Sequence, residues 1–300
     1  MTLQFLADGL IAGALIGLGA IGVTLTYSIL RFANFAHGEF VSFGAYATLL
    51  LAAIIGSVVA GADQPIGPFS FGWGVIVAAV AAMASTGALA LDAVLFKRLR
   101  DKGAAITIVM ASFGASMALR SLLEFAFTSR PAYFSRDLQI ALPVGLGIRV
   151  TPDQIALLGI TAVLMIGVHL LLTRSQIGRA MRAVSENPAL ARVAGVDVAR
   201  VIRAAWLIGG ALACVAGVML GLLVQIRPFM GFDLLLPMFA AAILGGIGSV
   251  PGALAGALIV GVSEAAAVQM IGAEWRAAVA FLLLIGVLLV KPTGLFGRSD

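Results

Sequence analysis

The stretch over residues 204–225, AAWLIGGALACVAGVMLGLLVQ, carries no charged side chain and is rich in glycine and alanine. A helix needs about 20 predominantly apolar residues to cross roughly 30 Å of hydrocarbon, and this stretch is long enough. A helix also satisfies its own backbone hydrogen bonds, as a segment surrounded by lipid must. The stretch therefore predicts a membrane-spanning helix and, with it, a helical membrane protein.

The rest of the chain has the same character. Of its 300 residues, 61% are apolar and 11% are charged. Soluble domains average about 45–50% apolar and about 25% charged residues. Further runs with few or no charges cover residues 9–30, 40–62, 64–91, 103–119, 154–173, 234–263 and 277–290. We therefore expect an all-α integral membrane protein, a polytopic bundle of about eight or nine transmembrane helices that forms one domain over residues 1–300.

One of these runs is interrupted by GGIGSVPG, residues 245–252. The interruption predicts a short or re-entrant segment, then a turn, then a helix. Non-helical backbone at membrane depth is tolerated only beside protein or a water-filled cavity. Gly245, Gly246 and Gly248 are therefore either a tight packing corner or part of a translocation path. Small residues spaced four apart predict close helix contacts at three places: Gly9, Gly13 and Gly17; Gly217 and Gly221; Gly252 and Gly256.

Basic residues gather in two connections. One holds Lys97, Arg98, Arg100 and Lys102, and the other holds Arg174, Arg179, Arg182, Arg192, Arg200 and Arg203. Cytoplasmic loops carry an excess of Lys and Arg, and the two spans between these connections allow both to face the cytoplasm. This orientation predicts an N-terminus outside and a C-terminus in the cytoplasm.

The sequence offers little for catalysis. It contains no phosphate-binding loop of the form G-x-x-x-x-G-K-[ST], no H-E-x-x-H and no G-x-S-x-G. With 2 histidines, His37 and His169, and 1 cysteine, we expect no metal site, no disulfide framework and no cofactor in this chain. Nucleic acid is not an expected partner.

Charged side chains within the runs are costly in lipid and mark paired or functional positions. Arg120 and Glu124 are four residues apart, so we expect them to pair. Asp92 is expected to pair with the neighbouring basic cluster. Glu264 follows a long uncharged run, which predicts a polar partner on another helix or a water-filled cavity, and it is also a candidate for the translocation path.

Two polar segments remain. In NFAHGEF, residues 34–40, Asn34 is placed to cap the next helix, and Glu39 suits the positive end of its dipole. Asn34, His37 and Glu39 are also candidates for an inner gate. In the loop over residues 174–203, Asn187, Pro188 and Gly195 predict a short capped helix. Such a loop fits either an anionic lipid surface or a partner's groove.

These segments resemble a known family. IGRAMRAVSENPALARVAGVDV, residues 177–198, is similar to the coupling loop of bacterial ABC importer permeases of the branched-chain amino acid class. NFAHGEF with GAYAT, residues 44–48, resembles the first cytoplasmic turn and second helix of that family. AAILGGIGSVPGALAGALIVGVSEA, residues 241–265, resembles its broken segment, and LLVKPTGLFGR, residues 288–298, its terminus.

The resemblance implies a permease subunit of an ATP-driven importer in the bacterial cytoplasmic (inner) membrane. Its partners would be a second permease, two cytoplasmic ATPases that bind ATP and Mg²⁺, and a solute-binding protein. The substrates would be branched-chain amino acids, with urea or short-chain amides as the alternative. The resemblance assigns ATPase coupling to these residues: Gly178, Arg179, Arg182, Glu186, Asn187, Leu190, Ala191 and Gly195. The rivals are a stand-alone secondary transporter or channel, and an intramembrane enzyme.

Overall fold

The computed structural model describes residues 3–84, 87–100, 105–135, 139–145, 147–291 and 293–297. Within them, eight helical segments are long and apolar enough to cross a membrane. They are α1 (Gln4–Leu30), α2 (His37–Val58), the segment Trp73–Arg100, described over residues 73–84 and 87–100, α6 (Ala105–Phe127), α7 (Pro152–Arg174), α10 (Val198–Leu223), α12 (Val250–Ile271) and the segment Ala273–Val290 that contains α13 (Arg276–Val290). A shorter apolar helix, α11 (Met230–Gly245), completes the bundle, and the predicted all-α membrane class is confirmed.

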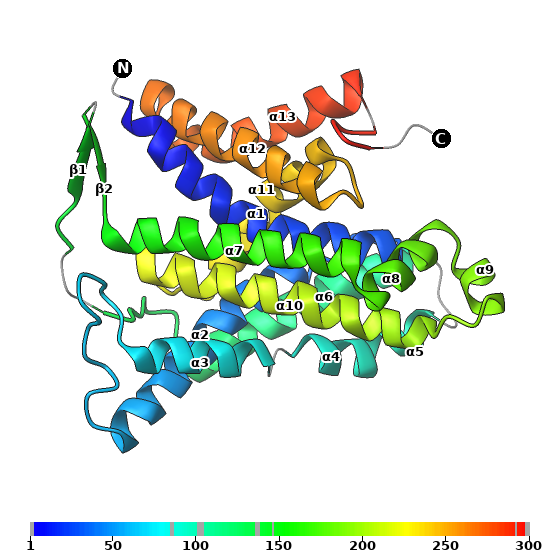
Figure 1. The fold of residues 1–300 in the computed structure, drawn as a ribbon, viewed down its shortest axis with the longest axis horizontal. Helices are drawn as coiled ribbons and strands as arrows, with labels where there is room; N and C mark the ends of the chain where they lie inside the picture. The colour runs from blue at the N-terminus through cyan, green and yellow to red at the C-terminus, as the bar shows by residue number, and fades with distance from the viewer. Residues whose placement is uncertain are drawn as a thin grey trace.

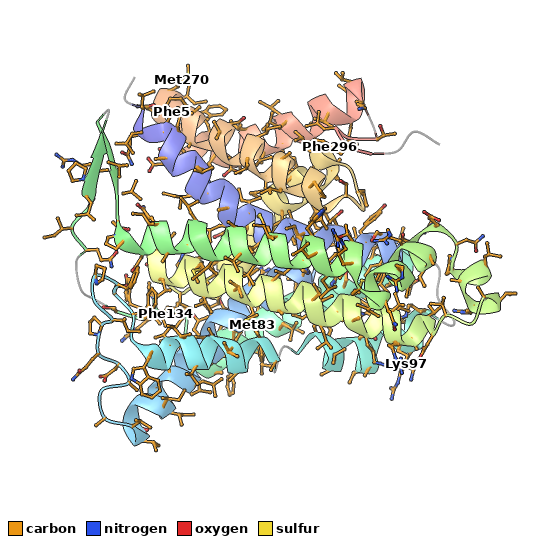
Figure 2. All side chains as sticks on the ribbon, viewed as in Figure 1. Phe5, Met83, Lys97, Phe134, Met270 and Phe296 are labelled. Carbon is orange, nitrogen blue, oxygen red and sulfur yellow. The ribbon has the colours of Figure 1, made fainter. Side chains whose placement is uncertain are left out.

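The long helices lie roughly along one direction (Figure 1). A small antiparallel hairpin of β1 (Leu142–Gly145) and β2 (Ile148–Val150) stands at one end, which we call the hairpin end. The short helices α8 (Gln176–Glu186) and α9 (Pro188–Val193) stand at the opposite end, which we call the α9 end. Lys97 also lies toward the α9 end, so the two basic regions share one end of the bundle (Figure 2).

The helix α1 forms the centre of the bundle. It is almost entirely buried, and it packs against α2, α7, α10, α11 and α12. A helix that is apolar on every face needs such a surrounding of other helices. By contrast, α13 has one buried residue, Ala280, and most of its residues are exposed. Movement of α1 would therefore be passed to most of the other helices.

Glycines from all three predicted repeats lie where helices approach closely. A methyl group added at Gly9 or Gly13 would meet the backbone of α12, and one added at Gly217 would overlap the backbone of Val41 in α2. A methyl group at Gly252 would overlap the carbonyl of Gly245. Small side chains let backbones come this close, as in other membrane bundles. The predicted helix contacts are confirmed at these positions, whereas Gly221 faces the side chains of Ile226 and Phe134, which lie outside the helices.

The crossing of α1 and α12 gives a stability prediction. Gly261 of α12 lies against the backbone of Gly9 and Gly13, so we expect Gly261→Ala to lower the stability of the protein by about 1–3 kcal/mol. The control is Gly159→Ala in α7, where an added methyl group has nothing within 4 Å. Thermal unfolding in detergent compares the two variants, and equal melting temperatures would refute the close crossing.

The interruption after α11 has the predicted form of a helix, a turn and a helix. Gly246 and Gly248 have φ of 97° and 91°, in the left-handed region that glycine adopts without steric cost. Ser249 caps α12 by accepting the backbone N–H of Gly252 at 3.1 Å. The chain near its C-terminal end covers the turn, because the amide of Phe296 donates to the carbonyl of Gly245 at 3.1 Å (Figure 2).

Two segments differ from the sequence-based expectation. The run over residues 64–91 begins as a loop, and its helix α3 (Trp73–Ala84) starts only after Pro65, Pro68 and Gly72. Helical structure is found again in α4 (Ala88–Leu91), a π-helical turn (Asp92–Phe96) and α5 (Lys97–Arg100). The predicted basic connection is therefore partly helical, and Lys102 lies outside the described residues, as does Arg298. The hairpin was not predicted.

Candidate functional site

The helix α8 is held firmly against the end of α7. Ser175 caps α8 by accepting the backbone N–H of Gly178 at 3.0 Å, and a methyl group at Gly178 would overlap the carbonyl of Leu172. The guanidinium of Arg182 donates to that same carbonyl, and Arg179 donates to the carbonyl of Arg174 at 3.3 Å. These contacts satisfy carbonyls that the end of α7 leaves without helical partners.

The helix α9 has the caps predicted from the sequence. The side chain of Asn187 accepts the backbone N–H groups of Ala189 and Leu190, each at 3.0 Å. Pro188 occupies the first turn, where its missing N–H costs nothing. Gly195 follows the helix with φ of 83°, the left-handed conformation that commonly ends a helix. A six-residue helix is marginal alone, so these caps help to fix its shape.

The two faces of α9 differ. Ala191 is buried and packs in a cluster with Met181, Val184 and Val201. On the other side, Leu190 is 65% exposed and Val193 is 86% exposed. Ala191 therefore packs α9 against α8 and α10 and is not part of the surface that a partner could touch. Leu190 and Val193 form an exposed apolar surface on a rigid element, which we call the α9 surface.

Arg31 links this loop to the central helix. Its guanidinium donates to the backbone carbonyls of Ser185 at 2.6 Å and Glu186 at 3.2 Å, at the end of α8. Arg31 also ends α1 in a left-handed conformation, with φ of 57°. Lys and Arg stabilise helix C-termini by bonding such carbonyls. No pattern in the sequence indicates this role of Arg31, because its partners are 154 and 155 residues away.

The next helix, α10, begins at a capped residue outside the bundle. Asp197 accepts the backbone N–H of Arg200 at 3.0 Å. That hydrogen bond, together with the nearby charges of Arg203 and Arg200, lowers the pKa of Asp197 below its usual value. The cap is therefore ionised at neutral pH, and it is lost only when the pH falls through this lowered pKa.

The helix α2 begins inside the bundle, at the height of the middle of α1. His37 is buried against Gly22 of α1, and Gly22 lies eight residues before Leu30, about 12 Å from the α9 end at roughly 1.5 Å per residue. The side chain of Asn34 accepts the N–H of Ala36 at 3.1 Å. Asn34 thus caps the turn before α2 rather than the helix itself, whose N-cap is Ala36.

The helix α11 begins at the same place. The hydroxyl of Ser42 donates to the carbonyl of Pro228 at 3.0 Å and accepts the N–H of Gly231 at 3.0 Å. Gly38 packs directly on the carbonyl of Gly231. Two helices therefore start within the bundle, each preceded by non-helical backbone that neighbouring segments partly cover. Such backbone at membrane depth is tolerated only beside protein or a water-filled cavity.

An ion pair lies at this meeting point. Glu39 is fully buried, and its Oε1 accepts hydrogen bonds from Arg120 at 2.7 Å and from Ser116 at 2.8 Å. The guanidinium of Arg120 also lies over the rings of Phe229 and Phe232, at 4.7 and 4.3 Å. This arrangement joins α2, α6 and α11 through one buried cation.

The predicted pairing of Arg120 with Glu124 is wrong. A pair four residues apart on one helix contributes only about 0.2–0.5 kcal/mol. A buried carboxylate without a cation is far more costly, and the fold brings Glu39 of α2 to Arg120. The other predicted partners are confirmed: Asp92 pairs with Arg100 at 2.7 Å, and Glu264 of α12 pairs with Arg276 of α13 at 2.7 Å.

The glycines of the interrupted segment have different surroundings. Gly245 packs against Gly252, and Gly246 packs against Gly294 and Gly297. The amide of Gly248 donates to the hydroxyl of Thr24 at 2.7 Å. Gly248 also lines a cavity of about 670 Å³ at the α9 end, together with Arg31, His169, Arg182 and Glu186.

A second cavity, of about 720 Å³, lies toward the hairpin end between α1, α10, α11, α12 and α13. We call it the hairpin-end cavity. It is lined by charged residues, among them Glu264, Arg276, Arg227 and Asp233. Sequence reasoning singled out only Glu264 of these four. In the part of the chain that the structure describes, no group of three or more His, Cys, Asp or Glu residues is arranged to hold a metal ion.

The chain matches known proteins over nearly its whole length. Residues 5–288 match the family described as branched-chain amino acid transport system / permease component. The high-affinity branched-chain amino acid transport system permease protein LivH of Escherichia coli K12 is 33% identical, over 99% of this chain and 96% of the relative. BraD of Pseudomonas aeruginosa, with the same description, is 34% identical over the same shares. A probable LivH of Methanocaldococcus jannaschii is 29% identical over 98% and 92%.

Proposed function

Because the chain belongs to the family of permease components of branched-chain amino acid transport systems, we propose that it carries leucine, isoleucine and valine across the membrane as part of an ATP-driven importer. The full-length similarity to relatives named for this transport supports the substrate class. The proposed coupling to the ATPases depends on the α9 surface. This surface is an exposed apolar patch on a capped helix in the loop between α7 and α10.

The partners supply what this chain lacks. The sequence has no phosphate-binding loop of its own, so ATP and Mg²⁺ are bound by two partner ATPases. A second permease completes the path, and a solute-binding protein delivers the amino acid. The α9 surface rests in a groove of one ATPase, where an amphipathic or apolar helix face is a common ligand. Its contacts are Leu190 and Val193, with Glu186, Asn187 and Gly195 at the edges.

Motion passes from the ATPase to the bundle through the contacts of α8. Gly178, Arg179 and Arg182 fix α8 to the end of α7, and Arg31 fixes the end of α8 to α1. A displacement of α9 therefore moves α1 and α7 together. Closure of the ATPases on ATP favours one arrangement of the permease over the other, since they bind the two with different affinity.

The gate lies where α2 and α11 begin inside the bundle. Short helices with breaks at membrane depth line the substrate sites of many transporters. Asn34, His37 and Glu39 belong to this gate: hydrogen bonds of Asn34 and Glu39 hold it together, and His37 is buried beside them. Gly248 borders the cavity that opens toward the α9 end. Gly245 and Gly246 serve as the packing corner on which α11 and α12 turn.

In this proposal the α9 end faces the cytoplasm of a bacterial cell, and the N-terminus lies outside the cytoplasmic membrane. A cysteine at Arg192 should react with a membrane-impermeant thiol reagent only from the cytoplasmic side. A cysteine at Ile66, in the loop before α3, is the matched control and should react only from outside. The native Cys214 is buried. The reverse pattern would overturn the orientation.

The substrate is tested by competition. The complete transporter in vesicles takes up labelled leucine while an excess of a second solute is present. We expect isoleucine and valine to reduce the uptake, because all three share a zwitterionic head and a branched apolar side chain. Urea and acetamide serve as controls and should have no effect. Competition by urea or acetamide, with none by isoleucine, would refute the branched-chain substrate.

A further inference from the structure

The hairpin-end cavity contains two ion pairs of different burial. Glu264 is 1% exposed, and its Oε2 accepts from Nε of Arg276 at 2.7 Å. The side chain of Arg276 is half exposed. A second pair, Arg227 with Asp233 at 3.6 Å, is about half exposed on both sides. The first pair is therefore built into the wall of the cavity, and the second stands at its edge.

The inner pair leaves hydrogen-bonding capacity on both members. Oε1 of Glu264 is buried and has no hydrogen-bond partner within the described chain. Arg276 donates to Glu264 through Nε, and its guanidinium has four further N–H groups on the Nη atoms. An acceptor and a set of donors thus stand side by side. A buried carboxylate oxygen without a donor is costly unless a ligand supplies one.

Apolar side chains line much of the remaining wall, and Asp8, Gln154 and Glu274 also border the cavity. Ile11 and Leu15 of α1, Leu220 of α10 and Leu234 of α11 line the same cavity. Its volume of about 720 Å³ falls in the range of roughly 300–1,000 Å³ typical of small-molecule sites, which combine apolar walls with a few fixed polar groups. The lining thus places the polar atoms of Glu264 and Arg276 beside apolar side chains of α1, α10 and α11.

We propose that the hairpin-end cavity binds the zwitterion of an amino acid with an apolar side chain. Its α-ammonium group donates to Oε1 of Glu264, and its α-carboxylate accepts from the guanidinium of Arg276. Both charges of the ligand are carried on one carbon, so they need an acceptor and a donor as close as this pair provides. The side chain lies against the apolar wall. The inference rests on the proposed function for the class of substrate, and it adds where this chain holds that substrate.

A ligand with only one of the two charges should bind poorly. Isoamylamine has the side chain and amine of leucine without the carboxylate, and 4-methylpentanoate has the carboxylate without the amine. Isoamylamine leaves the guanidinium of Arg276 without a carboxylate from the ligand, and 4-methylpentanoate leaves the buried Oε1 of Glu264 without a donor. Truncating one side of a buried, hydrogen-bonded charge pair costs enough to weaken binding by about tenfold or more. This selectivity separates a zwitterion site from an apolar cavity.

The test measures protection of a cysteine in the reconstituted transporter without ATP. Ala277 lines the cavity beside Arg276 and is exposed, so Ala277→Cys, in a Cys214→Ala background, reports on occupancy. Leucine should slow its modification by an impermeant thiol reagent, whereas isoamylamine and 4-methylpentanoate at equal concentration should not. Glu264→Gln and Arg276→Gln should each abolish the protection. Val58→Cys at the exposed end of α2 is the control and should be unprotected.

The outcomes separate the site from the transport function. Equal protection by leucine and either analogue would overturn the zwitterion site, as would no protection in a preparation that still shows ATP-driven uptake. Protection by leucine in a preparation without such uptake would support the site and count against the proposed function. If Glu264→Gln or Arg276→Gln does not fold, the comparison of the three ligands on the unaltered pair still decides whether the cavity is a zwitterion site.

Discussion

Arg120→Met is expected to lower the free energy of unfolding by about 3–5 kcal/mol, because it leaves the buried carboxylate of Glu39 without its cation. Glu39 is fully buried, and the side chain of Arg120 is 12% exposed. The substitution keeps most of the volume of the side chain, so the lost charge dominates the effect. Unfolding of the detergent-solubilised protein by a denaturing detergent, followed by tryptophan fluorescence, measures the change.

Two further variants show whether the pair itself is responsible. Adding Glu39→Gln to Arg120→Met removes the unpaired charge, so the double variant should be more stable than Arg120→Met alone. Glu124→Gln should have little effect, because Arg120 is paired with Glu39. A stable Arg120→Met variant, or a large loss from Glu124→Gln, would contradict the assignment.

Leu190→Asp combined with Val193→Asp is expected to reduce ATP-driven uptake by about tenfold or more, since a charge placed in an apolar contact is poorly tolerated. Both side chains are exposed, so the permease itself should fold and reach the membrane normally. The ATPase should no longer co-purify with it. Uptake and co-purification are measured on the same membranes.

The matched control for this pair is Val144→Asp in the hairpin, which is also exposed at 65% but lies at the opposite end of the bundle. It should leave co-purification of the ATPase unchanged. Normal uptake by the α9 variant, or loss of the ATPase from the Val144 variant alone, would show that α9 is not the coupling element.

Local sequence patterns were enough to predict most of the helices. Uncharged runs located the spans, and Asn187, Pro188 and Gly195 located α9, because capping depends on residues only a few positions apart. The interruption at residues 245–252 was found for the same reason. The hairpin was missed because residues 129–152 contain no clear alternation of apolar and polar side chains.

Contacts between distant segments could not be predicted in this way. Arg120 has a carboxylate four residues away in sequence, and yet it pairs with Glu39 from another helix. Arg31 bonds carbonyls of α8, and neither its spacing nor its neighbours indicate this. The charged residues of the hairpin-end cavity likewise come from α1, α11, α12 and α13 and from segments between helices. Glu264 was detected only because a charge in an apolar run is conspicuous.

The central claim is that this chain moves leucine only when partner ATPases hydrolyse ATP. Vesicles containing the chain, its second permease, the ATPases and the solute-binding protein are supplied with labelled leucine, and either ATP, no nucleotide or a non-hydrolysable ATP analogue is enclosed on the ATPase side. We predict accumulation of leucine with ATP and none in the other two conditions. Uptake at the same rate without ATP would contradict the account and would indicate a secondary transporter or channel.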